Sequence, residues 1–273
     1  MMRYCRFLLD GQPQYGSVED RAGELWITGP APAPEEDLAF KLASLTTTAP
    51  HHGFHPRPLR EAALLPPVTP SKIICVGRNY REHVKELGNE LPAEPLLFFK
   101  PPSSLLGCGG TVQLPAASER VDFEGELGLV IGRRTRNFAP HAGWENVVRG
   151  LTLVNDISAR DLQKKDGQWT RAKGFDTFCP VGPIVSDALD LNAGLTLETR
   201  VNGELRQRGS TADFIFSIPQ LLSYISAAFT LEPGDLILTG TPSGVGPLSP
   251  GDRVEVSIPG LGVLVNTVSG KAN

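Results

Sequence analysis

Apolar and acidic side chains alternate along residues 121–131, which read VDFEGELGLVI. Because successive side chains of a β-strand point to opposite faces, this pattern predicts a strand with one apolar face and one acidic face. The acidic face carries Asp122, Glu124 and Glu126 before it turns to Gly128 and Val130. Such a strand runs from an open edge of a sheet into a core, so we expect the chain to fold around a sheet.

The acidic face of this strand has two interpretations. Carboxylates two residues apart on a strand lie roughly 6 to 7 Å apart and repel each other unless a proton or a cation lies between them. A hard divalent ion such as Mg²⁺ or Mn²⁺ prefers oxygen ligands and would suit such a pair. The pattern is equally typical of a strand face exposed to water, so the residues alone leave both interpretations open.

The composition argues against several classes of protein. The 273 residues carry a net charge of −4 without a basic stripe, so nucleic acid is not an expected partner. The apolar run near the N-terminus, Phe7 to Leu9, is too short for a membrane span or a signal-peptide core. The cysteines are scattered and form no Cys-x-x-Cys pair, which fits a reducing compartment, and we expect a cytoplasmic protein. The 29 glycines and 24 prolines indicate many turns and short strands.

Residues 1–70 are predicted to form a small N-terminal α/β domain. The elements predicted there are strands at 3–9, 14–18 and 24–28 and a helix at 35–43. The Pro-rich passage 56–70 has no periodicity and is typical of a connector, so we place the domain boundary near its end. An exposed loop is favoured over a metal site for His51, His52 and His55.

Residues 71–273 are predicted to form a larger, β-rich domain. Apolar runs bounded by Gly or Pro predict its strands, and the dipeptide Asn202-Gly203 predicts a hairpin turn. The predicted strands besides 121–131 are 72–77, 96–100, 151–154, 195–201, 235–239, 253–258 and 263–268, and the predicted helices are 80–87 and 217–226.

The predicted helix 80–87 carries a candidate acid–base pair. Asn79 can cap its N-terminus with Glu82 as the reciprocal partner, and Gly88 is a typical helix stop. His83 and Glu86 are three residues apart and are therefore neighbours on the helix surface. A surface ion pair and a catalytic pair are both consistent with this spacing.

Two further segments lie where sites are commonly assembled. Asp156 follows the predicted strand 151–154, where the chain changes direction. The Gly-rich run 239–246 is neither a phosphate-binding loop, since no Lys-Ser/Thr ends it, nor a dinucleotide fingerprint, since no helix follows. Its backbone amides and the Thr241 hydroxyl could face an anion. The sequence contains no Gly-x-Ser-x-Gly elbow, which disfavours a serine hydrolase.

Five motifs resemble those of the fumarylacetoacetate hydrolase family, in particular its acylpyruvate hydrolase-like bacterial members. They follow the family's order over residues 72–268, and five motifs in order are far more specific than any one of them. The motifs are Val76-Gly77-Arg78-Asn79-Tyr80 with His83 and Glu86, Asp122-Phe123-Glu124-Gly125-Glu126-Leu127, Asn155-Asp156-Ile157-Ser158-Ala159-Arg160-Asp161, Lys173 to Pro180, and Thr239-Gly240-Thr241-Pro242.

The resemblance implies a fold, a cofactor and an assembly. The implied fold is α+β and β-rich, with mixed sheets in a β-sandwich or roll and the small N-terminal domain as an addition. The implied cofactor is Mg²⁺ or Mn²⁺, bound by Glu124, Glu126 and Asp156. The implied assembly is a homodimer, and neither nucleic acid nor a membrane is an expected partner.

The resemblance also assigns the other site residues. His83, assisted by Glu86, would be the base, and Lys173 would place a cation beside a developing enolate. The helix that carries the pair could move as a lid, and loops 86–95 and 163–172 would determine which substrate tail is accepted. The positions that hold substrate oxygens match Arg160, Gln163 and Thr241.

The implied substrates are 2-oxo acids with a further carbonyl or carboxylate two carbons on. Breaking the C3–C4 bond would leave a pyruvate enolate that the metal stabilises. With the His–Glu pair this predicts a metal-dependent hydrolase of acylpyruvates or fumarylacetoacetate-like 2,4-dioxo acids. Alternatives are an oxaloacetate-type decarboxylase, an enol–keto isomerase or decarboxylase of 2-hydroxyhepta-2,4-diene-1,7-dioate in aromatic catabolism, and a β-rich protein with a structural cation and no catalysis.

Overall fold

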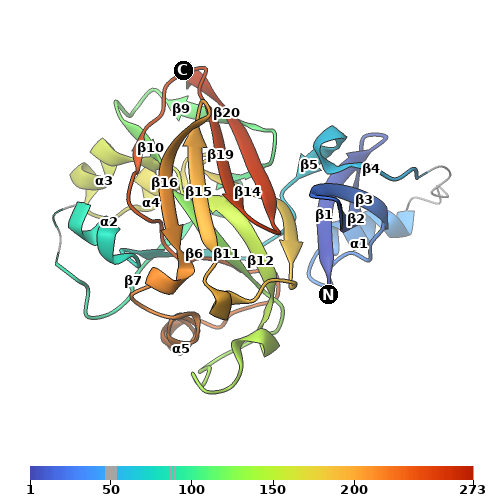
Figure 1. Cartoon of the computed structure of the whole chain (residues 1–273), viewed down its shortest axis with the longest axis horizontal. Helices are drawn as coiled ribbons and strands as arrows, with labels where there is room; N and C mark the ends of the chain where they lie inside the picture. The colour runs from blue at the N-terminus through green and yellow to red at the C-terminus, as the bar shows by residue number, and fades with distance from the viewer. Residues whose placement is uncertain (47–53, 87, 89, 273) are drawn as a thin grey trace.

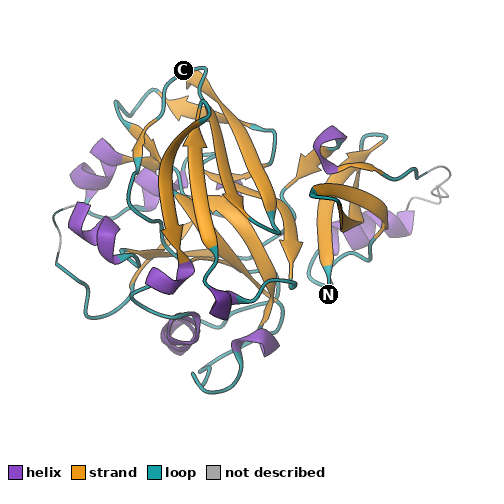
Figure 2. Ribbon diagram, viewed as in Figure 1, coloured by secondary structure: helices purple, strands orange, loops and turns teal. Residues whose placement is uncertain are grey.

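The computed structural model describes residues 1–46, 54–86, 88 and 90–272 of the chain. Figure 1 shows a large body built mainly of strands and, beside it, a smaller lobe that contains the N-terminus. Strands dominate both parts (Figure 2), which confirms the β-rich fold predicted from the sequence. None of the described helices is long and apolar enough to cross a membrane.

The small lobe contains a curved antiparallel sheet, one α-helix and one 3₁₀ turn. Its elements are β1 Arg3–Leu9, β2 Gln12–Arg21, β3 Glu24–Pro30, α1 Leu38–Thr46, β4 Arg57–Pro58, η1 Leu59–Glu61 and β5 Ala63–Leu65. β4 pairs with β3 and β5 pairs with β1, so the passage 56–70 adds two strands to this sheet. The passage predicted as a connector thus contains two strands that the sequence did not reveal, because strands this short leave no periodic pattern. His55 is exposed, whereas His51 and His52 lie outside the described residues.

A single twelve-stranded sheet runs through both parts of the molecule. Its strands in the large body are β6 Ile73–Gly77, β7 Leu96–Lys100, β8 Leu105–Gly107, β11 Gly125–Ile131, β12 Val148–Asn155, β14 Cys179–Ser186 and β17 Leu236–Leu238. The order is β4-β3-β2-β1-β14-β12-β11-β17-β6-β7, with β5 and β8 off this path. β1 meets β14 only through Arg3 and Tyr4, so a short stretch of pairing joins the lobe to the body.

Two smaller sheets complete the large body. The three-stranded sheet contains β10 Val121–Phe123, β13 Ser158–Ala159 and β18 Gly246–Pro247. The five-stranded sheet contains β9 Thr111–Pro115, β15 Thr196–Val201, β16 Glu204–Ser210, β19 Arg253–Ile258 and β20 Gly262–Ala272. Leu127 and Leu129 of β11 share one buried core with Leu197, Val256 and Leu264 of the five-stranded sheet. Two sheets face to face across this core form the predicted sandwich.

Short helices lie around these sheets. They are α2 Arg81–Glu86, η2 Pro102–Ser104, η3 Trp144–Asn146, α3 Arg160–Asp166, α4 Thr170–Gly174, η4 Leu191–Ala193, η5 Thr211–Asp213 and α5 Ile218–Ala228. α5 begins as predicted, with Ser217 and Gln220 in a capping box and Pro219 in the first turn. The predicted hairpin between β15 and β16 is confirmed, since Asn202 and Gly203 both have positive φ.

The stretch 121–131 differs from its prediction in two ways. The strand is interrupted at Glu124, so that β10 belongs to the three-stranded sheet and β11 to the twelve-stranded sheet. Every residue of the stretch is buried, so the predicted open edge is wrong. A Cβ atom at Gly125 would fall against the Thr199 side chain and 3.2 Å from Val256, which shows how closely the two sheets pack there.

The helix cap predicted at Asn79 is also wrong. The Asn79 amide nitrogen donates to the Thr239 carbonyl (2.8 Å), and its side-chain oxygen accepts from the Phe216 amide (2.8 Å). Asn79 therefore joins the end of β6 to two distant segments instead of capping α2. The predicted helix stop is confirmed, since Gly88 has φ 66° and its amide donates to the Lys85 carbonyl (2.9 Å).

Candidate active site

Three carboxylates from two neighbouring strands lie together in the large body. Glu124 lies between β10 and β11, Glu126 is in β11, and Asp156 directly follows β12. One oxygen atom of each residue lies within 4.8 Å of the others, and all three side chains are buried. The structure thus brings together the three residues predicted as metal ligands.

Strand pairing explains why these carboxylates lie close together. β11 and β12 are antiparallel with Gly125 opposite Asn155. Glu124 and Asp156 are the next residues beyond this pair, so they lie side by side. The Asp156 amide donates to the Glu124 carbonyl (2.8 Å), and the Glu124 amide donates to the Asn155 side-chain oxygen (2.8 Å). These bonds fix two residues that are far apart in the sequence.

Two buried lysines contact this carboxylate cluster. Lys173 Nζ donates to Glu124 Oε2 (2.7 Å) and to Asp156 Oδ2 (2.5 Å). Lys100 Nζ donates to the other oxygen of Asp156 (2.7 Å). Lys100 had no predicted role, although it ends the apolar strand β7 directly before Pro101. A lysine that ends a buried strand is the signal that could have found it, because a buried ammonium requires anionic partners.

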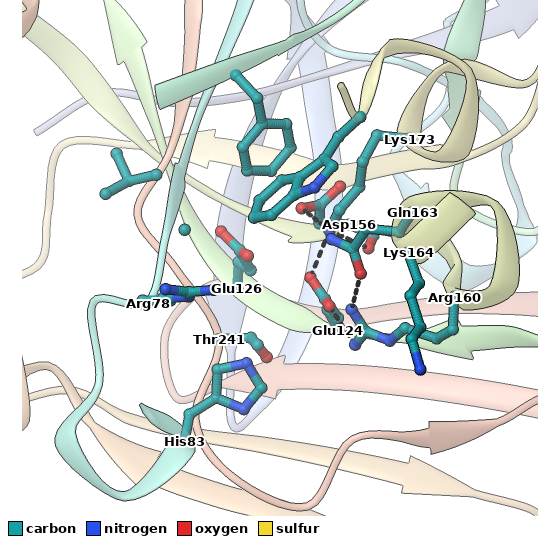
Figure 3. A pocket seen from close by; sticks show the side chains of 14 residues that line it. Arg78, His83, Glu124, Glu126, Asp156, Arg160, Gln163, Lys164, Lys173 and Thr241 are labelled. Carbon is teal, nitrogen blue, oxygen red and sulfur yellow. Dashed lines mark hydrogen bonds and ion pairs between the residues drawn. The ribbon is translucent and has the colours of Figure 1, made fainter. Parts of the chain in front are cut away.

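Arg160 is engaged by groups of the protein on three sides. Its Nε donates to Asp122 Oδ2 (2.9 Å), and its Nη1 donates to Gln163 Oε1 (3.0 Å). Its Nη2 forms an ion pair with Glu124, as the dashed lines in Figure 3 show. The two predicted substrate-binding residues of helix α3, Arg160 and Gln163, are therefore bound to each other.

Thr241 lines the site, but its hydroxyl group is already occupied. The hydroxyl donates to the Gly125 carbonyl (2.8 Å) and accepts from Gln207 Nε2 (2.7 Å). Gln207 Oε1 accepts from the Gly125 amide (2.9 Å), so this buried glutamine of β16 joins the site to the five-stranded sheet. The hydroxyl proton predicted to face a substrate oxygen is thus used within the protein, and Gln207 is a supporting residue that the sequence did not reveal.

Charges around Glu124 keep both it and Lys173 ionised. Burial favours a raised pKa for Glu124, but the positive charges of Arg160 and Lys173 outweigh burial and hold its pKa well below the ordinary value. Burial favours a lowered pKa for Lys173, but Asp156 and Glu124 outweigh burial and raise its pKa. The lysine therefore stays a fixed positive charge beside the carboxylates.

Glu126 is the carboxylate without a cationic partner among the described residues. Its Oε2 accepts a hydrogen bond from the Gly240 amide (2.7 Å). Burial raises its pKa well above the ordinary value, and the negative charges of Asp156 and Glu124 raise it further. A divalent cation would take the place of the proton, and a donor set made of carboxylate oxygens suits Mg²⁺ or Mn²⁺. The cluster therefore fits the predicted metal.

The His83–Glu86 pair lies on α2 and forms as the helical spacing predicts. His83 Nδ1 and Glu86 Oε2 are 3.0 Å apart, and the His83 side chain is buried. Glu86 Oε1 accepts from the Gly244 amide (2.9 Å), so the Gly-rich run holds the carboxylate in place. The burial of His83 argues against the alternative of a surface ion pair.

All nine residues predicted for the site lie in one region, and eight of them line one cavity of about 480 Å³. Glu86 is the exception, and it lies behind His83. Figure 3 shows His83 on the opposite side of Thr241 from the carboxylates Glu124 and Glu126. The remaining lining residues are Val76, Gly77, Arg78, Phe98, Lys164 and Trp169. Of these, Lys164 and Trp169 lie in the segment 163–172 that was predicted to select the substrate tail.

The chain that carries this site is similar to known proteins. The family model described as Fumarylacetoacetate (FAA) hydrolase C-terminal matches residues 72–269, which include the whole site. The chain belongs to the fumarylacetoacetate hydrolase family. The resemblance drawn from the five sequence motifs is thereby confirmed.

Members of the fumarylacetoacetate hydrolase family match the chain over most of its length. Protein Rv2993c of Mycobacterium tuberculosis is 45% identical over 269 residues, covering 98% of each chain. Oxaloacetate tautomerase YisK of Bacillus subtilis is 43% identical over 224 residues, covering 77% of this chain and 74% of its own. The crystal structure of 2-hydroxyhepta-2,4-diene-1,7-dioate isomerase from Mycobacterium marinum has a TM-score of 0.83 and 39% identity, covering 100% of both chains. These relationships support an enzyme over a non-catalytic protein with a structural cation.

Proposed function

We propose that this protein is a divalent-metal-dependent enzyme that interconverts the enol and keto forms of a 2-oxo acid such as oxaloacetate. The observation that carries the proposal is the buried cluster of Glu124, Glu126 and Asp156 in one cavity with Lys173 and His83. The named relatives support it, since a tautomerase and an isomerase of a 2-hydroxy-2-ene acid both move a proton next to the C2 oxygen.

The carboxylate cluster would hold Mg²⁺ or Mn²⁺ through Glu124, Glu126 and Asp156. When bound, such a cation polarises the 2-oxo group and stabilises negative charge on its oxygen. The Lys173 ammonium is fixed between two of these carboxylates and adds positive charge in the same place. Glu124 and Asp156 could bind the cation and still accept from Lys173, because each carboxylate oxygen has two lone pairs.

His83 would move the proton at C3. Its Nδ1 is hydrogen-bonded to the Glu86 carboxylate, so the neutral ring carries its proton there and leaves Nε2 as the base. Glu86 is held in turn by the Gly244 amide, which fixes the orientation of the imidazole. A base oriented by a carboxylate and by a backbone amide suits proton transfer at one defined position.

Hydrolysis of acylpyruvates, the activity first predicted from the sequence, is the second candidate. The same His83–Glu86 pair could activate a water molecule for attack at C4, and the enolate left behind would meet the same positive charges. Decarboxylation of oxaloacetate also leaves this enolate. The three reactions differ in their products, so product analysis separates them.

The decisive experiment compares oxaloacetate and acetylpyruvate with the purified protein in the presence of Mg²⁺ or Mn²⁺. We expect faster decay of the enol form of oxaloacetate, followed by its absorbance, without release of CO₂. Release of CO₂ with pyruvate would identify a decarboxylase, and acetate with pyruvate from acetylpyruvate would identify a hydrolase. No acceleration of any of these reactions with either metal would contradict the enolate chemistry as a whole.

A further inference from the structure

Arg78 is a cation in the cavity that the proposed chemistry does not use. It lines the cavity and is half-buried. Within the described part of the chain its guanidinium makes no hydrogen bond and no ion pair. Figure 3 shows it beside Glu126, at the side of the view opposite Lys164. An arginine in a cavity without a partner is unusual, because its five N–H groups are strong donors that seek anions.

The backbone at Arg78 is held in a conformation that a residue with a side chain rarely adopts. Its φ is 60°, in the left-handed region. The next residue is fixed, since the Asn79 side chain bonds to Thr239 and Phe216 and its carbonyl accepts from the Ile215 amide (2.8 Å). Strained positions that are held by their surroundings concentrate at functional sites.

The other cations of the site cannot readily receive a second anionic group. Lys100 and Lys173 are bound to Asp156, and Arg160 is bound to Asp122 and Glu124. Arg78 and Lys164 are left as the lining cations without a partner among the described residues. Lys164 is exposed, whereas Arg78 is half-buried and lies on the Glu126 side of the view in Figure 3. A guanidinium in that position can bind a carboxylate through two parallel hydrogen bonds.

We propose that Arg78 binds the distal carboxylate of a 2-oxo diacid, the carboxylate that is not at the metal, and so selects diacids over monoacids. This inference deepens the proposed function and rests on it for the placement of the other end of the substrate. The C1 carboxylate and the C2 oxygen lie at the cluster, and the distal carboxylate lies on the Arg78 side. Both named relatives carry a diacid in their names, oxaloacetate and a 1,7-dioate.

The test uses two stable ligands that differ only in the distal carboxylate, malate and 2-hydroxybutanoate. Neither carries a 2-oxo group, so binding can be measured by calorimetry with saturating Mg²⁺ and without turnover. We expect the wild-type protein to bind malate more tightly. Arg78→Gln should lower the affinity for malate by a factor on the order of 10 to 100 and leave that for 2-hydroxybutanoate unchanged.

Two further variants keep the test decisive. Arg78→Lys retains the charge without the fork and should recover part of the malate preference. Lys164→Gln is the matched control, since it removes the other unpaired lining cation, and it should leave both affinities unchanged. Melting curves of each variant check that it folds. If Arg78→Gln does not fold, the affinities of Arg78→Lys for malate and 2-hydroxybutanoate are compared with those of the wild-type protein.

Several outcomes would overturn the inference. The first is equal affinity of the wild-type protein for the two ligands. The second is an equal loss of affinity for both ligands in the Arg78 variants. The third is a loss of the malate preference in Lys164→Gln but not in the Arg78 variants. The proposed function can fail separately. If the protein binds malate through Arg78 but does not convert oxaloacetate, the role of Arg78 stands and the proposed reaction is wrong.

Discussion

At the scale of single residues, the site is a set of buried charges that balance one another except at Glu126. Asp156 contacts two lysines, and Glu124 contacts Lys173 and Arg160. Among the described residues, Glu126 accepts only the hydrogen bond from the Gly240 amide. A buried carboxylate next to two ionised ones is costly without a proton or a cation. Glu126 is therefore the residue at which a bound metal would change the energy of the site most.

Glu126→Gln tests this description. The amide keeps the shape and the hydrogen bond from Gly240, so the metal-free variant should be at least as stable as the wild-type protein. Its affinity for Mg²⁺ or Mn²⁺, measured by calorimetry, should fall by more than the roughly 10- to 100-fold typical of losing a residue that only supports a ligand. Asp235→Asn is the control, since Asp235 is buried and paired with Lys72, and neither residue contacts the cluster. An equal loss of metal affinity in the control would show that Glu126 is no ligand.

His83→Ala tests the base. Removal of a positioned general base should slow enol–keto interconversion by roughly 10²- to 10⁴-fold, with metal affinity retained. The same helix offers a matched control in Glu82→Gln, since Glu82 and Lys85 form an exposed ion pair at the same spacing. Rates are followed by the absorbance of the enol at saturating metal. A His83 variant with the wild-type rate would show that another group moves the proton.

At the scale of elements, the Gly-rich run 239–246 acts as a clamp on the protein's own carboxylates. The amide of Gly240 binds Glu126, and the amide of Gly244 binds Glu86. The Gly-rich run was expected to turn its amides toward an anion. In the structure the anions are two side chains, one from the acidic cluster and one from the His–Glu pair. The run therefore couples the geometry of α2 to that of β11.

Gly244→Ala should disturb this coupling. Gly244 has φ 98°, and a Cβ atom there would fall against the Arg206 carbonyl, so the loop must shift and the bond to Glu86 weaken. We expect a loss of kcat/KM together with a loss of stability in chemical denaturation. Gly251→Ala is the control, with φ 91° and no atom near its Cβ position. It should cost about 1 kcal/mol of stability and leave kcat/KM unchanged. Equal kinetics in the two variants would contradict the role of the Gly244 amide.

At the scale of the whole molecule, apolar packing, a short strand pairing and an ion pair join the small lobe to the large body. Tyr4 and Tyr15 of the lobe share a buried apolar cluster with Val154 of the body. β1 pairs with β14 through only two residues. The Arg149 guanidinium of β12 binds the Glu36 carboxylate of the small lobe through both terminal nitrogens, and both side chains are largely buried. A bidentate, shielded ion pair is worth more than an exposed one. This pair adds a directional contact to the apolar packing between the lobe and the body.

Arg149→Met should therefore destabilise the protein. We expect a loss of roughly 1 to 3 kcal/mol in chemical denaturation, between the values for exposed and for buried pairs, because Glu36 loses its partner. Arg134→Met breaks the exposed pair with Glu232 and should cost about 1 kcal/mol or less. Equal stability of the two variants would show that the lobe is held by other contacts. The homodimer implied by the family stays a prediction, which light scattering of the purified protein would test.

Local chemistry in the sequence determined much of this protein. Apolar runs bounded by Gly or Pro predicted most strands of the large body, because a buried strand is apolar on both faces and ends at a turn. The spacing of His83 and Glu86 predicted their contact, because residues three apart are neighbours on any helix. The five motifs identified the family and, through it, the cluster of Glu124, Glu126 and Asp156.

Only the tertiary structure decided how the charges are shared. Lys100 and Gln207 entered the site because pairing between distant strands buried them beside it. The same long-range pairing engaged Arg160 and left Arg78 without a partner among the described residues. Whether a charged group is free or neutralised depends on which groups the fold brings within a few ångströms, and no local pattern contains that information.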